Sequence, residues 1–234
     1  NTQKPIAAES AYRMATMLDP GTLDWQLGLA RSFFDQRRYA DAATLCGELI
    51  ANQPDSADLW MLQGNAFIGM QEPMRAAQNF EFADRLGAST PASLKQLGNI
   101  YANEGLFDLS VTSFVKMMEL DDEGEIGPAV SAAKVLTANA AFEEATRLVG
   151  AIKRLHGNLL LPEERKDLLK LEARIAVAQG LGGEEARLLE EIVQLDPLDG
   201  DALILLGDHY ARHERVEEAV FQYQRAAELE GFEA

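Results

Sequence analysis

The sequence predicts an all-α fold in which antiparallel helix pairs stack into a solenoid. An aromatic and a small residue each recur every 34 residues, at Phe33, Phe67 and Tyr101 and at Ala30, Gly64 and Gly98. Charged residues separate the short apolar runs along the whole chain, as in amphipathic helices. A fixed period of this length indicates one supersecondary unit stacked several times, an architecture that usually offers an extended binding surface.

Residues 57–90 show the predicted unit as two helices joined by a turn. Apolar and small residues lie at helical spacing on both sides of residues 69–73: Trp60, Gly64 and Phe67 before them, and Ala76, Phe80 and Ala83 after them. Small residues let two helix backbones approach closely, and the aromatic residues fill the space around them. Pro91 follows Thr90, a pattern that predicts a capped helix start.

The period divides the chain into six copies and one half-copy. We place the copies at residues 23–56, 57–90, 91–124, 126–159, 166–199 and 200–233, with residues 5–19 as the second helix of an earlier copy. Grouped by regularity, the segments are 1–22 (truncated repeat), 23–124 (three regular repeats), 125–165 (degenerate repeat plus insertion) and 166–234 (two further repeats). We expect all of them to form one continuous solenoid domain.

The fourth and fifth copies depart from the regular pattern. Pro128 opens the fourth copy, and Gly180 to Gly183 should loosen the turn of the fifth. The extra residues 160–165 predict a wider joint with a longer helix between these copies. The first helix of the truncated repeat would otherwise cover Tyr12, so we expect that ring to lie at an uncovered end.

The pattern resembles the tetratricopeptide repeat family over nearly the whole chain. The third copy carries it through Leu94, Leu97, Gly98, Tyr101, Gly105, Phe107, Ser110 and Phe114, and the last copy through Leu206, Gly207, Tyr210, Ala219, Tyr223, Ala226 and Leu229. The resemblance implies a right-handed superhelix that acts as a protein-interaction scaffold. It implies no enzyme activity and no cofactor.

The resemblance also implies that the fifth and ninth positions of each first helix point into a concave groove. We select eight of them as partner-binding residues: Arg31, Met61, Asn65, Lys95, Asn99, Lys134, Lys170 and Arg174. The other four are Leu27, Val130, Ile204 and Asp208. Five of the twelve are basic in an acidic chain, so we expect an acidic or carboxylate-bearing peptide as the partner. The alternative is that these cations pair with Asp and Glu of adjacent helices.

The family's carboxylate clamp is matched only in part. Lys95 and Asn99 correspond to its first Lys and Asn. Ser131 stands where the clamp has a second Asn, and Asp167 and Leu171 stand where it has Lys and Arg. We therefore expect a peptide different from the chaperone tails that the clamp binds.

Composition excludes several partner classes. The net charge of -17 argues against nucleic acid and against anionic membrane surfaces, because both are bound through clustered Lys and Arg. No apolar run is long enough for membrane insertion, so we expect a soluble protein, and both cytoplasm and periplasm remain open. The single Cys46 is interpreted as a small buried apolar residue.

No catalytic or metal site is predicted. His209 and His213 lie four residues apart, but a third ligand is missing nearby, and we interpret them as ordinary helix-face histidines. Residues 180–183 follow a predicted helix and precede no Lys-Ser or Lys-Thr, which argues against a phosphate loop. The acidic pairs at residues 121–122, 163–164 and 184–185 are interpreted as solvated helix ends.

Two further functions remain as alternatives. The chain begins with Asn1 inside a repeat, so it is expected to be a fragment. The array would then be the docking or substrate-presenting part of a larger enzyme or envelope-assembly protein. The second alternative is weak homo-oligomerisation through uncapped ends, which light scattering would exclude if the mass stayed at 25.7 kDa at every concentration.

Overall fold

The computed structural model describes residues 3–121 and 124–229, and these contain thirteen α-helices and no strand. Seven helices precede residue 121: α1 (Gln3–Leu18), α2 (Leu23–Asp35), α3 (Tyr39–Asn52), α4 (Ala57–Gly69), α5 (Pro73–Arg85), α6 (Pro91–Asn103) and α7 (Phe107–Leu120). Six follow it: α8 (Gly127–Ala138), α9 (Phe142–His156), α10 (Pro162–Ala178), α11 (Gly182–Leu195), α12 (Gly200–Arg212) and α13 (Val216–Ala227). The predicted all-α fold of helix pairs is confirmed.

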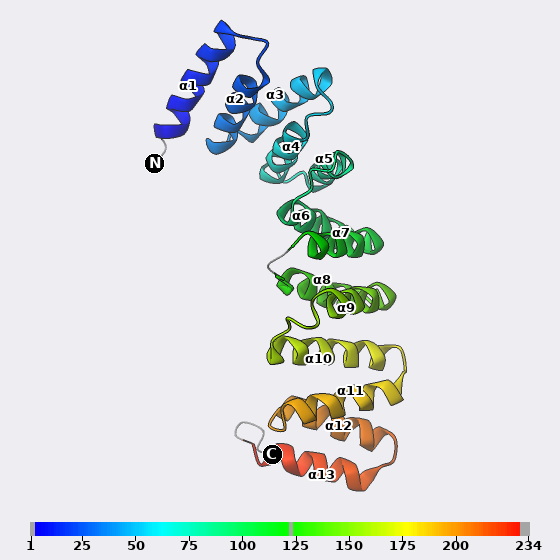
Figure 1. The fold of residues 1–234 in the computed structure, drawn as a ribbon. Coiled ribbons are helices and arrows are strands. Elements are labelled where there is room, and N and C mark those ends of the chain that lie inside the picture. The colour runs from blue at the N-terminus through cyan, green and yellow to red at the C-terminus, as the bar shows by residue number, and fades with distance from the viewer. Residues whose placement is uncertain (1–2, 122–123, 230–234) are drawn as a thin grey trace. The chain divides into compact units, whose positions relative to one another are not determined.

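The chain forms two compact units, Asn1–Leu120 and Asp121–Ala234. Within unit 1, each helix packs against the next one in the chain, so that α2–α3, α4–α5 and α6–α7 are successive antiparallel pairs (Figure 1). Within unit 2, the pairs are α8–α9, α10–α11 and α12–α13. The continuity of the solenoid from one unit to the other stays a prediction.

Small and large side chains face each other inside the repeats of unit 1. A Cβ atom on Gly64 would lie 2.7 Å from the Phe80 ring, and one on Gly98 would lie 2.7 Å from the Phe114 ring. In the pair α2–α3, Ala30 stands in the position of Gly64 and Gly98. Cys46, which is smaller than a phenylalanine, stands in the position of Phe80 and Phe114, and it lies in the same core cluster as Ala30. Burial raises the pKa of the Cys46 thiol to about 12, which agrees with its expected role as an apolar packing residue.

The turn inside every helix pair has the same geometry. An amide after the turn donates to a carbonyl five residues earlier, as from Glu72 to Phe67 at 2.9 Å and from Leu181 to Ala176 at 2.8 Å. One residue of each turn has a positive φ: Arg37, Gln71, Gly105, Ala140, Gly180 and Glu214. This is a left-handed helix C-cap, and it directs the chain back along the helix it has just left.

Two sequence expectations are corrected by the structure. The turn of the fifth repeat is not loosened: only Gly180 lies in the turn with a positive φ, while Gly182 and Gly183 open α11. Tyr12 is not an uncovered end residue either. It is half-buried, and its ring occupies the space that a Cβ on Gly28 of the following helix would need.

The longer helix expected at the insertion is present. Residues 162–165 extend the first helix of the fifth repeat, so that α10 has 17 residues. Its apolar face packs with α11 and α12 in one core cluster that contains Leu169, Leu188, Ile192 and Leu206. Among the residues that the structure describes, none of the helices has the length and apolar character that crossing a bilayer would require.

Candidate peptide-binding site

The ninth position of every first helix is exposed. These residues are Arg31, Asn65, Asn99, Lys134, Arg174 and Asp208. The fifth positions are less accessible: Met61, Lys95, Lys170 and Ile204 are half-buried, and Leu27 and Val130 are buried. The helical register expected from the period therefore places one accessible side chain on the same face of each repeat.

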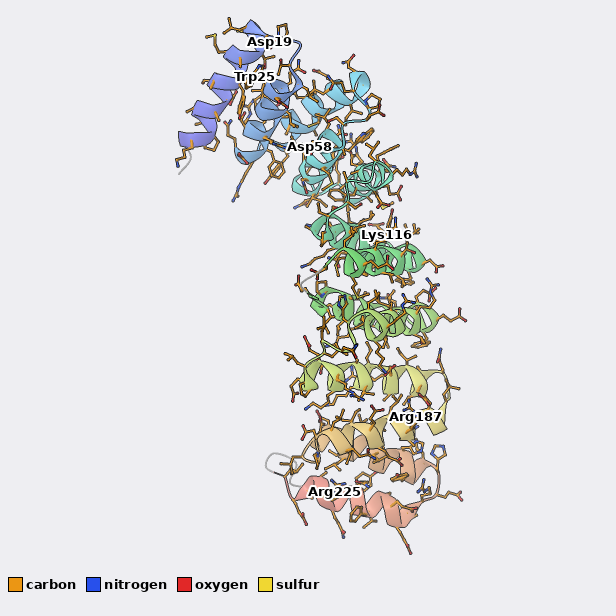
Figure 2. The ribbon with its side chains drawn as sticks, viewed as in Figure 1. Asp19, Trp25, Asp58, Lys116, Arg187 and Arg225 are labelled. Atoms are coloured by element: carbon orange, nitrogen blue, oxygen red, sulfur yellow. The ribbon has the colours of Figure 1, made fainter. Side chains whose placement is uncertain are left out.

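Unit 1 has a cavity of about 430 Å³ between α1 and α2. Tyr12 and Trp25 supply aromatic walls, and Leu27, Arg31, Asp24 and Asp35 also line the cavity. Trp25, labelled in Figure 2, is 39% exposed. The cavity thus combines apolar surface with charges of both signs.

Unit 2 has a second cavity of about 350 Å³ between α10, α11 and α12. Its lining residues are Lys170, Ala173, Arg174 and Val177 from α10, Glu185 and Leu189 from α11, and Asp201, Ile204 and Leu205 from α12. Three residues at expected groove positions, Lys170, Arg174 and Ile204, are therefore brought together. The expected residues Met61, Asn65, Lys95, Asn99 and Lys134 line neither of these two cavities.

Two cations at the expected groove positions, Arg31 and Lys134, are paired with carboxylates of the next repeat. Arg31 lies 3.1 Å from Asp58, which is in the first turn of α4 (Figure 2). Lys134 lies 3.6 Å from Asp167 of α10. Both pairs are exposed to solvent, so each contributes only about 0–1 kcal/mol and leaves its cation accessible to a competing anion.

Lys170 is held more firmly because its partner is buried. Its Nζ lies 2.7 Å from Asp199, whose side chain is 6% exposed and also accepts the Ala202 amide at the start of α12. Burial alone would raise the pKa of Asp199, but the hydrogen bonds from Lys170 and the Ala202 amide outweigh it and lower that pKa. Lys170 therefore fixes α12 against α10 as well as facing the cavity.

Pairing of the groove cations with acidic residues of adjacent helices was left open in the sequence, but the partners were not named, although a signal was present. Asp occupies the second position of four copies, at Asp24, Asp58, Asp167 and Asp201. Two of these carboxylates pair with a cation at the ninth position of the preceding repeat. The same recurrence places Asp201 on the cavity of unit 2.

The expected solvated helix end at Glu185 was wrong, because α12 packs over it. Glu185 is 2% exposed, and its carboxylate lies 2.9 Å from His209 Nδ1 and accepts from Arg212 at 2.5 Å. His209 is buried too, and the His213 ring stacks on it with the centroids 4.2 Å apart. This cluster joins α11 to α12, and its Glu185 lines the cavity of unit 2.

Metal binding receives no support from this cluster. No group of three or more His, Cys, Asp and Glu side chains in residues 3–121 and 124–229 is arranged to hold a metal ion.

Three solved structures are similar to this chain in fold. YrrB, described as a TPR protein with an unusual peptide-binding site, is 16% identical with a TM-score of 0.52, covering 95% of this chain and 94% of that chain. A tetratricopeptide repeat protein from Parabacteroides merdae is 12% identical with a TM-score of 0.53, covering 97% and 88%. A chain of the Naa15/Naa10 complex bound to HypK is 16% identical with a TM-score of 0.72. The match covers 94% of this chain but only 33% of that chain.

Sequence comparison agrees with the fold. None of the curated proteins matches the chain in sequence. The tetratricopeptide repeat model, in contrast, matches residues 4–57, 27–78 and 170–232, which together make up more than half of the chain. The chain therefore belongs to the tetratricopeptide repeat family.

Proposed function

We propose that this protein is a protein-interaction scaffold that holds an extended segment of a partner against the first helices of its repeats. The observation that carries the proposal is the cavity between α10, α11 and α12, because Lys170, Arg174 and Ile204 come from groove positions and line it together. Ligand sites of this kind combine apolar walls with a few polar groups that orient the ligand.

The charge of the accessible groove positions supports an acidic partner segment. Arg31, Lys134 and Arg174 are all exposed, whereas the protein as a whole carries a net charge of -17. A partner with carboxylates would be repelled by most of the surface and attracted to these positions. Such local complementarity orients a partner and speeds its association.

The proposal is tested by reversing one groove charge in each unit. A bait with Arg31→Glu and Arg174→Glu is compared with the unchanged protein in pull-downs from the native lysate, with quantitative mass spectrometry. The control bait carries Arg85→Glu and Arg154→Glu, two exposed arginines of second helices, so that both baits change net charge equally. We expect a partner that the control retains and that the groove variant loses by about tenfold or more.

The captured partner is then purified and titrated against all three baits. Circular dichroism of the groove variant should match that of the unchanged protein, because exposed ion pairs contribute little to folding. Partners held equally by the groove and control baits would contradict binding through the first helices.

A further inference from the structure

The joint between the fifth and sixth repeats differs from two other joints in how its charges are arranged. Arg31 and Asp58 lie 27 residues apart and form an ion pair. Lys134 and Asp167 form the same pair across the six-residue insertion. Arg174 and Asp201 stand at the corresponding positions, yet no ion pair joins them in the part of the chain that the structure describes. Both residues line the cavity of about 350 Å³.

The walls of this cavity are aliphatic. Ala173, Val177, Leu189, Ile204 and Leu205 supply them from three helices. Val177 and Leu205 are 46% and 41% exposed, so apolar surface at the mouth is open to solvent. Apolar surface of this kind, contributed by three helices, favours an apolar group that displaces water from it.

The charged groups around the cavity differ in whether they already have a partner inside the protein. The Glu185 carboxylate is hydrogen-bonded to His209 and Arg212, and Lys170 forms an ion pair with Asp199. Arg174 remains exposed, with no ion pair or hydrogen bond among the described residues. An incoming carboxylate would therefore find a guanidinium that has no internal partner to give up, and guanidinium binds carboxylate in two parallel hydrogen bonds.

We propose that this cavity is an anchor site for one aliphatic side chain of an extended partner segment. An acidic side chain within two residues of it binds Arg174. This proposal rests on the proposed function. It places the binding in unit 2 and specifies one aliphatic and one acidic side chain of the partner segment. The Asp201 carboxylate, on the α12 side of the cavity, disfavours an acidic group there, so the acidic side chain is expected on the α10 side, at Arg174.

Random peptides displayed on phage provide the test, because their C-termini are fused to the coat protein and only side-chain carboxylates are offered. Selection on the full chain should enrich Leu, Ile, Val or Met next to Asp or Glu. The consensus peptide is then synthesised with an amidated C-terminus and titrated by fluorescence anisotropy. We expect Arg174→Glu and Val177→Trp each to weaken its binding by about tenfold or more, through charge reversal and through filling of the cavity.

Two matched variants serve as controls. Arg154→Glu makes the same charge change on α9, and Val135→Trp makes the same size change at an exposed valine of α8. Both should bind the peptide as the unchanged protein does.

Three results would overturn the anchor site. The first is a consensus without the aliphatic and acidic pair, and the second is equal binding by the cavity variants and their controls. The third is failure of the amidated consensus peptide to bind while the same peptide with a free C-terminal carboxylate binds. If peptides bind and lose affinity only with Arg31→Glu, the scaffold function stands and the anchor site fails. If the selection enriches no peptide, the anchor site fails, and binding of internal peptide segments by the groove fails with it.

Discussion

At the scale of single residues, the backbone of the turns decides which substitutions the repeats accept. Ala140 has a φ of 59°, in the left-handed region, whereas Gly105 fills the equivalent turn position of the third repeat with a φ of 74°. A side chain in this conformation costs about 1–2 kcal/mol, because its Cβ approaches the following carbonyl oxygen. Four of the six turns carry that strain: Arg37, Gln71, Ala140 and Glu214.

Gly105→Ala should therefore lower the free energy of unfolding by about 1 kcal/mol. The strain of the left-handed conformation destabilises the folded protein, and the lower entropy of the unfolded chain with Ala offsets part of that loss. Apart from Gly105 itself and its two chain neighbours, no atom of the described residues lies within 4 Å of the added methyl group, so the local backbone conformation is responsible. Gly150→Ala is the matched control: it also adds a methyl group in open space, but inside α9, where it should stabilise by about 1 kcal/mol. Urea unfolding followed by circular dichroism measures both, and changes of the same sign would contradict the argument.

At the scale of a helix, α12 is fixed at its first residue by a group that also binds a neighbouring helix. Asp199 caps the Ala202 amide at 2.9 Å and lies 2.7 Å from Lys170 Nζ of α10. A neutral cap would hold α12 equally well, since Asn and Asp are similar caps. Only the carboxylate can also attract Lys170.

Asp199→Asn keeps the cap and removes the charge, so we expect a loss of about 2 kcal/mol at about pH 7. The pKa of Asp199 is lowered in the folded protein, so the stabilisation is complete above the ordinary value of 3.8 and is lost as pH falls through the lower folded value. The difference between variant and unchanged protein should thus be smaller at about pH 3 than at about pH 7.

The control is Thr90→Ala at the start of α6, where the Thr90 hydroxyl accepts the Ser93 amide without any charge. Its cost of about 1 kcal/mol should be the same at both pH values. Urea unfolding curves give both differences. A cost of Asp199→Asn that did not change with pH would mean that the carboxylate acts only as a cap.

At the scale of the whole molecule, the sequence predicted the repeats well because their period is set by the packed residues themselves. Gly64 recurs as Gly98 since each must admit a ring from the paired helix. The surroundings of the expected groove residues were predicted less completely. Pairing of Arg31 with Asp58 depends on how one first helix stacks on the next, and burial of Glu185 depends on α12 covering it. Neither relation follows from the spacing within one repeat.

The division into two compact units leads to a prediction about unfolding. Both tryptophans, Trp25 and Trp60, lie in unit 1, so their fluorescence reports on that unit, whereas far-ultraviolet circular dichroism reports on both. Leu94 in unit 1 and Leu188 in unit 2 are each 2% exposed, and replacing either by Ala should cost about 2–5 kcal/mol. We expect Leu188→Ala to move part of the dichroism transition to lower urea while the fluorescence midpoint stays in place.

Leu94→Ala should move the fluorescence midpoint, because the lost packing lies in the unit that the tryptophans report on. In a solenoid each repeat is stabilised by itself and by its neighbours, so a loss in one unit should remain local unless coupling through the joint exceeds it. If both probes shifted together in both variants, the two units would unfold as one cooperative structure. In that case the anchor site between α10, α11 and α12 would share the stability of the whole chain, and a partner bound there would raise both midpoints equally.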